Sequence, residues 1–190
     1  LHSNDMSSTQ QTSILPLDMA SIFHRQQNFK KGIAQSTTKQ RKAKLRKLLH
    51  AVEVTYRNEI RQALLEDFGK SAAEVDLTEI YPVTGEIKYA LRNLGDWMLD
   101  KPVNTKLAFF GSSSKIKYEP KGNVLIISPW NFPINLSFCP LISAIAAGNT
   151  VILKPSEHTE RTSALMKKMI NELFDEQEIA VIEGGINEST

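Results

Sequence analysis

The chain has 190 residues, of which 41% are hydrophobic and 23% charged, and its formal net charge is +2. This composition is typical of a folded globular protein, and it excludes a disordered or fibrous chain. No window approaches eighteen consecutive apolar residues, so we expect no membrane span in this sequence. A single cysteine excludes an internal disulfide framework and a multi-cysteine zinc site, and the four scattered histidines form no zinc-protease pair.

Residues 1–16 are expected to form a disordered tail, because nine of the first thirteen residues are Ser, Thr, Asn or Gln. This segment lacks the charged and apolar regions of a signal peptide. Together with the single cysteine, that absence favours a cytoplasmic protein.

Residues 17–104 are predicted to be a helical region with two long helices. The first is expected over residues 38–68 and stops at Gly69, although Glu66 and Asp67 are unfavourable at a helix carboxyl end. It carries one apolar stripe, made of Leu45, Leu48, Leu49, Val52 and Tyr56.

The second helix is expected from Asp76, as its N-cap, to a stop at residues 101–102. Pro82 is expected to lie in its first turn or to kink it. Apolar residues recur in it at three- and four-residue steps, at Ile80, Val83, Ile87, Leu91, Leu94 and Met98.

Between residues 19 and 52 the chain has nine Lys or Arg residues and no acidic residue, with the highest density over residues 39–47. One interpretation is a patch that binds nucleic acid or an anionic surface. The other is the solvated outer face of an amphipathic helix, which accounts for the run without any partner and is therefore favoured.

Residues 105–119 are predicted to form a β-hairpin, because short runs at 106–110 and 115–118 flank a Gly-Ser-Ser-Ser turn at 111–114. Two strands alone are marginally stable in water. We therefore expect a partner strand, either from elsewhere in the chain or from another subunit.

Residues 120–190 alternate between strand and helix patterns, with strands at 123–127, 151–153 and 180–182 and helices at 136–147 and 162–174. This order predicts an open parallel sheet with right-handed crossovers. The apolar run at 123–127 is typical of a strand buried on both faces. The fold class is therefore α/β, with N-terminal helices and a hairpin leading into part of a parallel sheet whose ligands bind beyond the carboxyl ends of its strands.

The segment after the first of these strands has residue types suited to a binding site. Two prolines, Pro129 and Pro133, restrain a loop in which Trp130 and Phe132 can wall a flat ligand. Asn131 carries an amide that can donate to a developing oxyanion. The alternative is a loop whose aromatic rings belong to the core and whose Asn131 makes an Asx-turn.

The segment after the second strand contains Lys154 and Glu157. A carboxylate after a strand can accept from the hydroxyls of a ribose, and a neighbouring lysine can donate to the same sugar. The alternative is an exposed ion pair of little consequence. The chain contains no Gly-x-Gly-x-x-Gly turn, so a dinucleotide would bind without it. Cys139 lies in an apolar run and is expected to be structural and unreactive.

Four segments together resemble the NAD(P)-dependent aldehyde dehydrogenase superfamily, in its class 3 and fatty-aldehyde branch. They are Glu-Pro-Lys-Gly at 119–122, Pro-Trp-Asn-Phe-Pro at 129–133, Ala-Ala-Gly-Asn at 146–149 and Lys-Pro-Ser-Glu at 154–157. The resemblance implies a Rossmann-like sheet and oxidation of an aldehyde to a carboxylate with NAD, with NADP as an alternative. It also implies a homo-oligomer joined through the hairpin.

The resemblance also assigns site residues. Asn131 would stabilise the oxyanion during catalysis, Lys154 and Glu157 would hold the adenosine ribose, and Gly185 would lie near the adenine site. Ser128, Pro129 and Trp130 would line the cofactor cleft. No metal site is expected.

This sequence lacks the glycine-rich segment, the general-base glutamate and the nucleophilic cysteine of that family. We therefore expect the N-terminal portion of such an enzyme, with the catalytic domain absent and no activity from this chain by itself. The alternatives are a non-catalytic nucleotide-binding module and a nucleic-acid binder that acts through residues 39–47.

Overall fold

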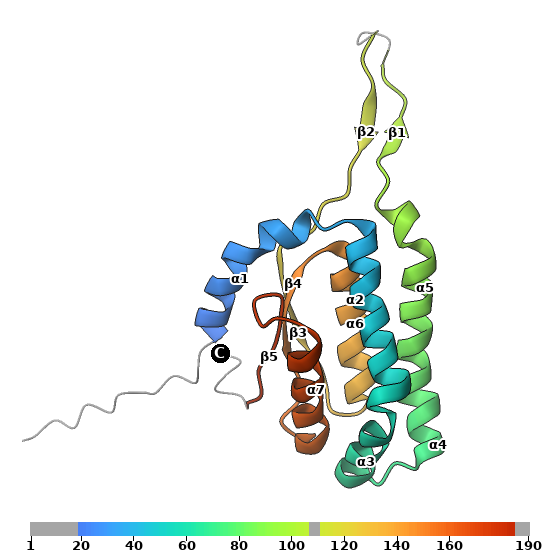
Figure 1. Ribbon diagram of the computed structural model, residues 1–190, viewed down its shortest axis with the longest axis vertical. Helices are drawn as coiled ribbons and strands as arrows, with labels where there is room; N and C mark the ends of the chain where they lie inside the picture. Colours follow the sequence, from blue (N-terminus) through green and yellow to red (C-terminus); the bar gives the residue numbers. More distant parts are fainter. Residues whose placement is uncertain (1–18, 107–110, 185–190) are drawn as a thin grey trace, which may run out of the picture.

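The structure is a computed structural model that describes residues 19–106 and 111–184, and its helices stand beside a small parallel sheet while a hairpin projects from one end (Figure 1). The predicted tail and Gly185 lie outside the described residues. The helices are α1 (Met19–Ala34), α2 (Thr38–His50), α3 (Arg57–Phe68), α4 (Ala72–Val75), α5 (Tyr81–Trp97), α6 (Pro133–Ala147) and α7 (Glu160–Leu173), with π-helical segments η1 (Ala51–Thr55) and η2 (Asp76–Ile80). The strands are β1 (Lys101–Val103), β2 (Ser114–Ile116), β3 (Asn123–Ile127), β4 (Thr150–Lys154) and β5 (Ile179–Val181).

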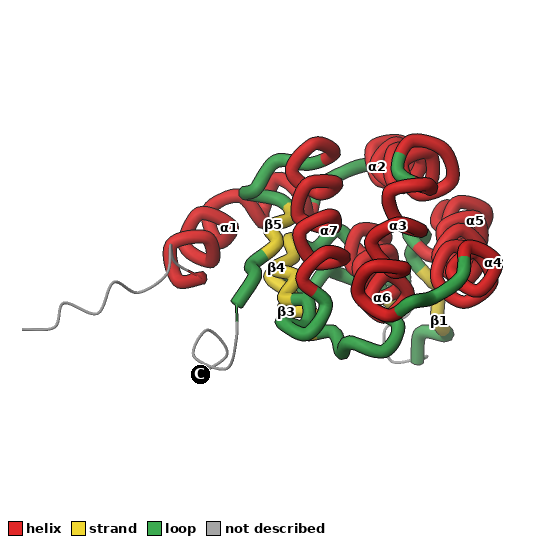
Figure 2. The backbone as a smooth tube through the Cα atoms, turned by 90° about the horizontal axis from the view of Figure 1, so that it is seen from below, coloured by secondary structure: helices red, strands yellow, loops and turns green. Residues whose placement is uncertain are grey.

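Strands β3, β4 and β5 pair in that order and all run parallel, as the alternating pattern predicts. Helices α6 and α7 cover one face of this sheet, α1 lies on the other face, and α2, α3 and α5 form a further layer outside α6 and α7 (Figure 2). Helix α6 therefore lies between the sheet and other helices. Its large side chains at Ile134, Phe138, Leu141 and Ile142 are all fully buried because apolar surface meets them on both sides.

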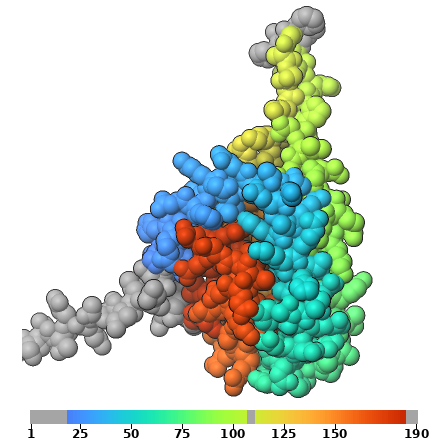
Figure 3. Space-filling model, viewed as in Figure 1, coloured from blue at the N-terminus to red at the C-terminus, as the bar shows by residue number. Residues whose placement is uncertain are grey.

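The polar side chain of Gln26 anchors α1 to the sheet. Its amide nitrogen donates to the backbone oxygens of Val151 at 2.9 Å and of Glu176 at 3.2 Å, so this fully buried group is satisfied. Nearby, Arg25 pairs with Glu176 at 2.6 Å. In the space-filling view, the blue residues of the first helices lie against red residues from late in the described chain, although the two segments are far apart in sequence (Figure 3).

The helix predicted over residues 38–68 is interrupted. After His50 the chain forms the π-helical segment η1, and Tyr56 then leaves helical geometry at φ −106° and ψ 3° before α3 begins. Tyr56 is buried and its hydroxyl donates to the Glu172 carboxylate of α7, a tertiary contact that local periodicity does not encode. The predicted stop is confirmed, since Gly69 caps α3 in the left-handed region at φ 70°.

Asp67 explains why acidic residues stand at the end of α3. Its carboxylate accepts from the backbone N–H groups of Arg161 at 3.2 Å and Thr162 at 2.8 Å, and from the Thr162 hydroxyl at 2.7 Å. These donors lie in the first turn of α7, where the N-cap residue Thr159 makes no capping hydrogen bond with its side chain. Asp67 is thus unfavourable for its own helix but caps the free N–H groups of a neighbouring one.

The prediction that Asp76 caps the second helix is wrong. The helical segment begins earlier, at Ala72, where the Ser71 hydroxyl accepts from the Glu74 N–H at 3.2 Å. The Asp76 carboxylate instead accepts from the guanidinium groups of Arg61 and Arg57, and these hydrogen bonds hold the pKa of Asp76 well below its usual range. Pro82 lies in the first turn of α5, directly after η2.

A hairpin is present, formed by the antiparallel pairing of β1 with β2, but its first strand lies at Lys101–Val103, before the predicted range of 105–119, and Lys101 stands opposite Ile116. The prediction of a strand at residues 106–110 falls largely on residues 107–110, which lie outside the described residues. The prediction that residues 123–127 are buried on both faces is wrong. Leu125 and Ile127 are 50% and 62% exposed, because α1 meets β3 near Asn123, whose side chain donates to the Gln26 side-chain oxygen at 3.4 Å, and leaves the later residues of the strand uncovered.

Candidate functional site

The segments that follow the three parallel strands meet at one edge of the sheet. The Ser128 N–H donates to the Lys154 backbone oxygen at 3.1 Å, and the Ile182 N–H donates to that of Leu153 at 2.9 Å. The Lys154 ammonium then reaches the Gly184 backbone oxygen at 2.9 Å. The carboxyl edge therefore brings the two predicted site segments together, as expected of parallel strands.

Lys154 and Glu157 face each other at this edge. The Lys154 side chain is only 4% exposed, whereas that of Glu157 is 38% exposed, and their charged atoms are 3.9 Å apart. The pKa of Glu157 is lowered by a hydrogen bond from its own backbone N–H, and the charges of Lys154 and His158 add to this. The edge thus presents an ionised, solvent-accessible acceptor, Glu157, beside a buried cation, Lys154. The alternative interpretation, an exposed ion pair of little consequence, does not describe this pair, because Lys154 is buried and hydrogen-bonded.

Three residues of the loop after β3 were predicted to line the cofactor cleft, and one of them is buried while two are exposed. Ser128 is buried, and its hydroxyl lies 2.6 Å from the Ser137 hydroxyl of α6, so it holds the loop against the helix. Pro129 is exposed and Trp130 is 53% exposed. The Trp130 indole stacks on Phe68 with ring centroids 6.1 Å apart and planes 26° apart. One face of this aromatic wall therefore rests on α3.

The side chain of Asn131 is exposed. No hydrogen bond engages its amide among the residues that the structure describes, whereas its backbone oxygen accepts from the Lys70 ammonium at 2.9 Å. An Asx-turn would require a hydrogen bond to the Asn131 side-chain oxygen, and the described part of the chain contains none. The amide N–H groups are therefore available to a ligand.

Sequence reasoning missed the ion pair that lies beneath this loop. Glu79 is fully buried, and its carboxylate accepts from Lys70 at 2.7 Å and from the Asn135 N–H at 2.9 Å. A signal was present, because Glu79 follows Val75 and precedes Val83 at four-residue steps and so places a charge on an apolar stripe. A buried carboxylate of this kind needs a partner.

The densest basic segment is divided between interior and surface. Arg41 is buried, and Lys44 pairs with Glu178, while Lys39, Arg46 and Lys47 are exposed. Two of the six cations therefore serve the fold, which weakens the interpretation as an anion-binding patch.

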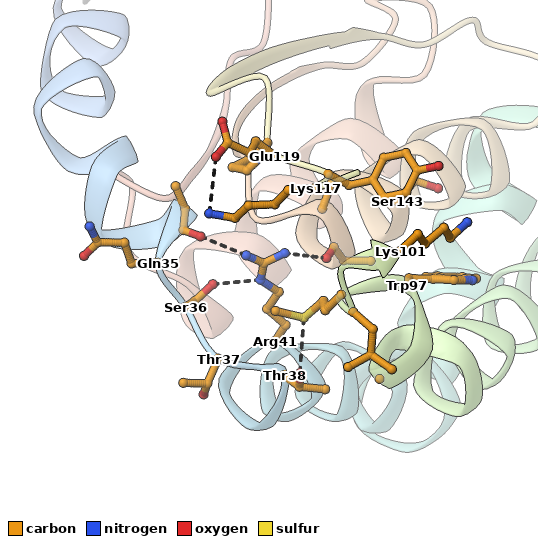
Figure 4. A pocket seen from close by; sticks show the side chains of 18 residues that line it. Gln35, Ser36, Thr37, Thr38, Arg41, Trp97, Lys101, Lys117, Glu119 and Ser143 are labelled. Carbon is orange, nitrogen blue, oxygen red and sulfur yellow. Dashed lines mark hydrogen bonds and ion pairs between the residues drawn. The ribbon is translucent and has the colours of Figure 1, made fainter. Parts of the chain in front are cut away.

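Arg41 borders a cavity of about 1020 Å³ between the α1–α2 turn, the end of α5 and the base of the hairpin (Figure 4). The guanidinium donates to the Ala34 and Ala146 backbone oxygens at 3.0 and 2.9 Å, and to the Ser36 hydroxyl at 2.9 Å. Burial lowers the pKa of Arg41. The two backbone acceptors lie at the carboxyl ends of α1 and α6, so Arg41 caps both helices.

This cavity is not the predicted cofactor cleft. Its lining includes Pro120, which precedes β3, and Ala147, which precedes β4, so it lies at the amino edge of the sheet. The site segments described above follow the strands and lie at the opposite edge.

No cluster of three or more His, Cys, Asp or Glu side chains suitable for a metal occurs within residues 19–106 and 111–184. Cys139 is half-buried, its thiol contacts the Asn135 side-chain oxygen at 3.2 Å, and burial raises its pKa. These surroundings fit the structural role expected for it. Among the described helices, none has both the length and the apolar character to cross a membrane.

Comparison with known proteins extends these observations. The model of the aldehyde dehydrogenase family matches residues 16–189. The chain is 48% identical over 149 residues to a 4,4'-diaponeurosporen-aldehyde dehydrogenase of Staphylococcus aureus. The matched region covers 78% of this chain and 32% of that protein. It is 45% identical over 130 residues to aldehyde dehydrogenase family 3 member B2 of Mus musculus, covering 68% and 27%.

Solved structures agree with the fold. A substrate-bound state of Staphylococcus aureus AldH superposes with a TM-score of 0.85 at 44% identity, over 89% of this chain and 37% of that one. A succinic semialdehyde dehydrogenase of Streptococcus pyogenes in complex with NADP⁺ gives a TM-score of 0.78 at 17% identity, covering 100% and 39%, which shows likeness of fold alone. The chain spans about a third of the length of the curated relatives it matches.

Proposed function

The chain belongs to the aldehyde dehydrogenase family, and on that premise we propose that it forms the amino-terminal, cofactor-binding part of an enzyme that oxidises an aldehyde to a carboxylate with NAD. The observation that carries the proposal is the carboxyl edge of the sheet. There the ionised Glu157, the buried Lys154 and the unengaged amide of Asn131 lie at or just beyond the carboxyl ends of neighbouring parallel strands.

The donor and acceptor set at this edge fits a nicotinamide dinucleotide. Glu157 would accept from the ribose hydroxyls, and Lys154, which keeps N–H capacity beyond its bond to Gly184, would donate to the same sugar. A nicotinamide held at this edge would supply the hydride acceptor that oxidation of an aldehyde requires. Because a 2′-phosphate would face the ionised Glu157, we propose NAD as the preferred cofactor, with NADP as the weaker one.

Asn131 would donate to the carbonyl oxygen as negative charge develops on it. Such a donor lowers the barrier when it is placed before the reaction, since no reorganisation is then needed. Pro129 and Trp130 would line the cofactor cleft, and Ser128 would hold that loop to α6 through Ser137. Gly185 stays part of the proposal as a residue near the adenine.

The chain by itself is proposed to be inactive. Its one cysteine, Cys139, is half-buried in contact with Asn135, and burial raises the thiol pKa, so it is a poor nucleophile. We also propose that the enzyme is a cytoplasmic homo-oligomer joined through the hairpin, whose two short strands project from the body. No role in nucleic-acid binding is proposed, because Arg41 and Lys44 are engaged inside the fold.

Calorimetric titration of the purified chain with NAD and with NADP tests the cofactor proposal. Glu157→Gln should weaken NAD binding several-fold and reduce the preference for NAD over NADP. Glu176→Gln is the matched control, because Glu176 is an exposed carboxylate paired with Arg25 at the amino edge of the sheet. Equal NAD affinity in both variants, or stronger binding of NADP to the parent chain, would contradict the proposed role of Glu157.

An activity assay separates the proposal from its alternatives. The chain should give no NADH with an aldehyde, whether or not it binds NAD. Binding without turnover fits both a cofactor-binding part and a non-catalytic nucleotide-binding module, so the same chain must also support turnover when a family catalytic segment containing the cysteine and glutamate is joined to it. Failure of that joined protein to turn over, although it is folded and binds NAD, would favour the module.

A further inference from the structure

We propose that Lys70 and Glu79 are positioning residues that hold the loop over residues 128–132 and so fix the backbone from which the Asn131 side-chain amide projects. The mechanical part of this proposal concerns the loop alone. Its catalytic meaning rests on the proposed function, because only there does Asn131 act as an oxyanion donor.

Lys70 joins three parts of the structure at one ammonium group. Its nitrogen lies 2.7 Å from a Glu79 carboxylate oxygen and 2.9 Å from the backbone oxygen of Asn131. It also lies 4.4 Å from the centre of the Phe132 ring and 5.2 Å from that of Phe68. The side chain is only 10% exposed, so these contacts are little screened by water.

Glu79 ties this ammonium to the helix that follows the loop. Its second carboxylate oxygen accepts at 2.9 Å from the N–H of Asn135, in the first turn of α6. Phe132, at the N-cap position, supplies no side-chain cap, so Glu79 fills that role from a distant helical segment. Asn135 adds a side-chain hydrogen bond to the Thr78 backbone oxygen at 3.1 Å.

The loop is therefore held at Asn131 and again on its carboxyl side, at the start of α6. Lys70 grips the backbone of Asn131 itself, and Glu79 grips α6 four residues later. No hydrogen bond engages the Asn131 side chain in the described part of the chain, so the clamp acts on the backbone from which the amide projects. A donor held in this way through its own carbonyl is placed before a ligand arrives.

The test uses Trp130 as a reporter of the loop. The chain has two tryptophans, and Trp97→Phe leaves Trp130 as the sole indole. The double variant Lys70→Met with Glu79→Gln removes the ion pair and the hold of Lys70 on the Asn131 backbone without leaving a buried unpaired charge. We expect acrylamide quenching of Trp130 to rise about twofold and its fluorescence anisotropy to fall, because a released loop moves on the nanosecond scale.

The matched control is Lys168→Met with Glu59→Gln. Lys168 also pairs with a glutamate, at 2.9 Å, and lies 5.3 Å from the centre of the Tyr56 ring, but both side chains of this pair are about half exposed. We expect no change at Trp130 in this control. Glu79→Gln alone, which keeps the shape and one acceptor oxygen, provides a milder variant with an intermediate change should the double variant fail to fold.

The enzyme that contains this chain supplies the second readout. We expect the double variant to lower kcat by roughly tenfold to a hundredfold, as displacement of a catalytic group by about 1 Å does, while KM for NAD changes less than twofold. Unchanged quenching and anisotropy of Trp130 in the folded variants would overturn the mechanical claim. A released Trp130 with unchanged kcat would overturn the catalytic claim. Failure of NAD binding by the unaltered protein would refute the proposed function and leave the Trp130 result standing.

Discussion

The close approach of Arg41 to Gly148 leads to a prediction about stability, for which Gly69 provides the control. Gly148 ends α6 in the left-handed region at φ 83°, and a Cβ added there would lie 2.5 Å from the guanidinium carbon of Arg41. Gly69 ends α3 in the same region at φ 70°, but a Cβ there would meet no atom within 4 Å. Gly69→Ala thus tests backbone strain alone, and Gly148→Ala adds a steric conflict.

The magnitudes follow from these two differences. An alanine in the left-handed region costs about 1–2 kcal/mol in each variant. At Gly148 the guanidinium, held by the Ala34 and Ala146 backbone oxygens, must also move, and overpacking of this kind costs about 1–3 kcal/mol. We therefore expect Gly148→Ala to lower the free energy of unfolding by about 2–5 kcal/mol, clearly more than Gly69→Ala.

Urea unfolding followed by far-UV circular dichroism measures both values, with equal slopes as the condition for comparing them. The same substitution in an Arg41→Met background completes a double-mutant cycle. There, the cost of Gly148→Ala should fall to that of Gly69→Ala, since a flexible methionine can give way. Equal costs for the two glycine variants in the unaltered background would refute the steric argument.

Three further predictions concern polar groups of the fold. Asp67→Ala should destabilise the protein by about 1 kcal/mol, the usual value of a helix cap, and reduce amide protection in the first turn of α7 by hydrogen exchange; protection lost uniformly along the chain would contradict a capping role. Two arginines lower the pKa of Asp76 in the folded protein, so Asp76 contributes stability that is present above pH ~4, the pKa of the unfolded chain, and is lost as the pH falls through the folded pKa. The free energies of unfolding of Asp76→Asn and of the parent protein should therefore converge as the pH is lowered. A constant difference between them at every pH would oppose this. The hydrogen bond to Glu172 raises the pKa of Tyr56 to about 12, so the stability that this hydrogen bond contributes is full below pH ~10 and is lost towards pH 12. An absorbance titration should contain a phase near pH 12 that Tyr56→Phe removes. Persistence of that phase in the variant would assign it to another tyrosine.

The candidate site was predictable where neighbouring residues carry its chemistry. Lys154 ends a buried strand and Glu157 follows it closely, and Asn131 follows another strand between two prolines. Parallel pairing then requires both segments to lie at one edge. The clamp of Lys70 and Glu79 was not predictable in the same way, because the contact between Lys70 and the Asn131 backbone joins residues 61 positions apart.

The sequence by itself determined the features that depend on local periodicity and backbone sterics. These are the alternation of strands and helices after residue 120 and the helix ends at Gly69 and Gly148, because only a residue without a Cβ readily adopts the left-handed conformation found there. Tertiary structure decided which polar groups serve an element other than their own. Asp67 caps α7 instead of stabilising α3, and the hydroxyl of Tyr56 reaches Glu172 where the predicted long helix breaks. Such partners are chosen by the packing of helices against each other, since a polar group must find its hydrogen bond wherever the fold leaves it.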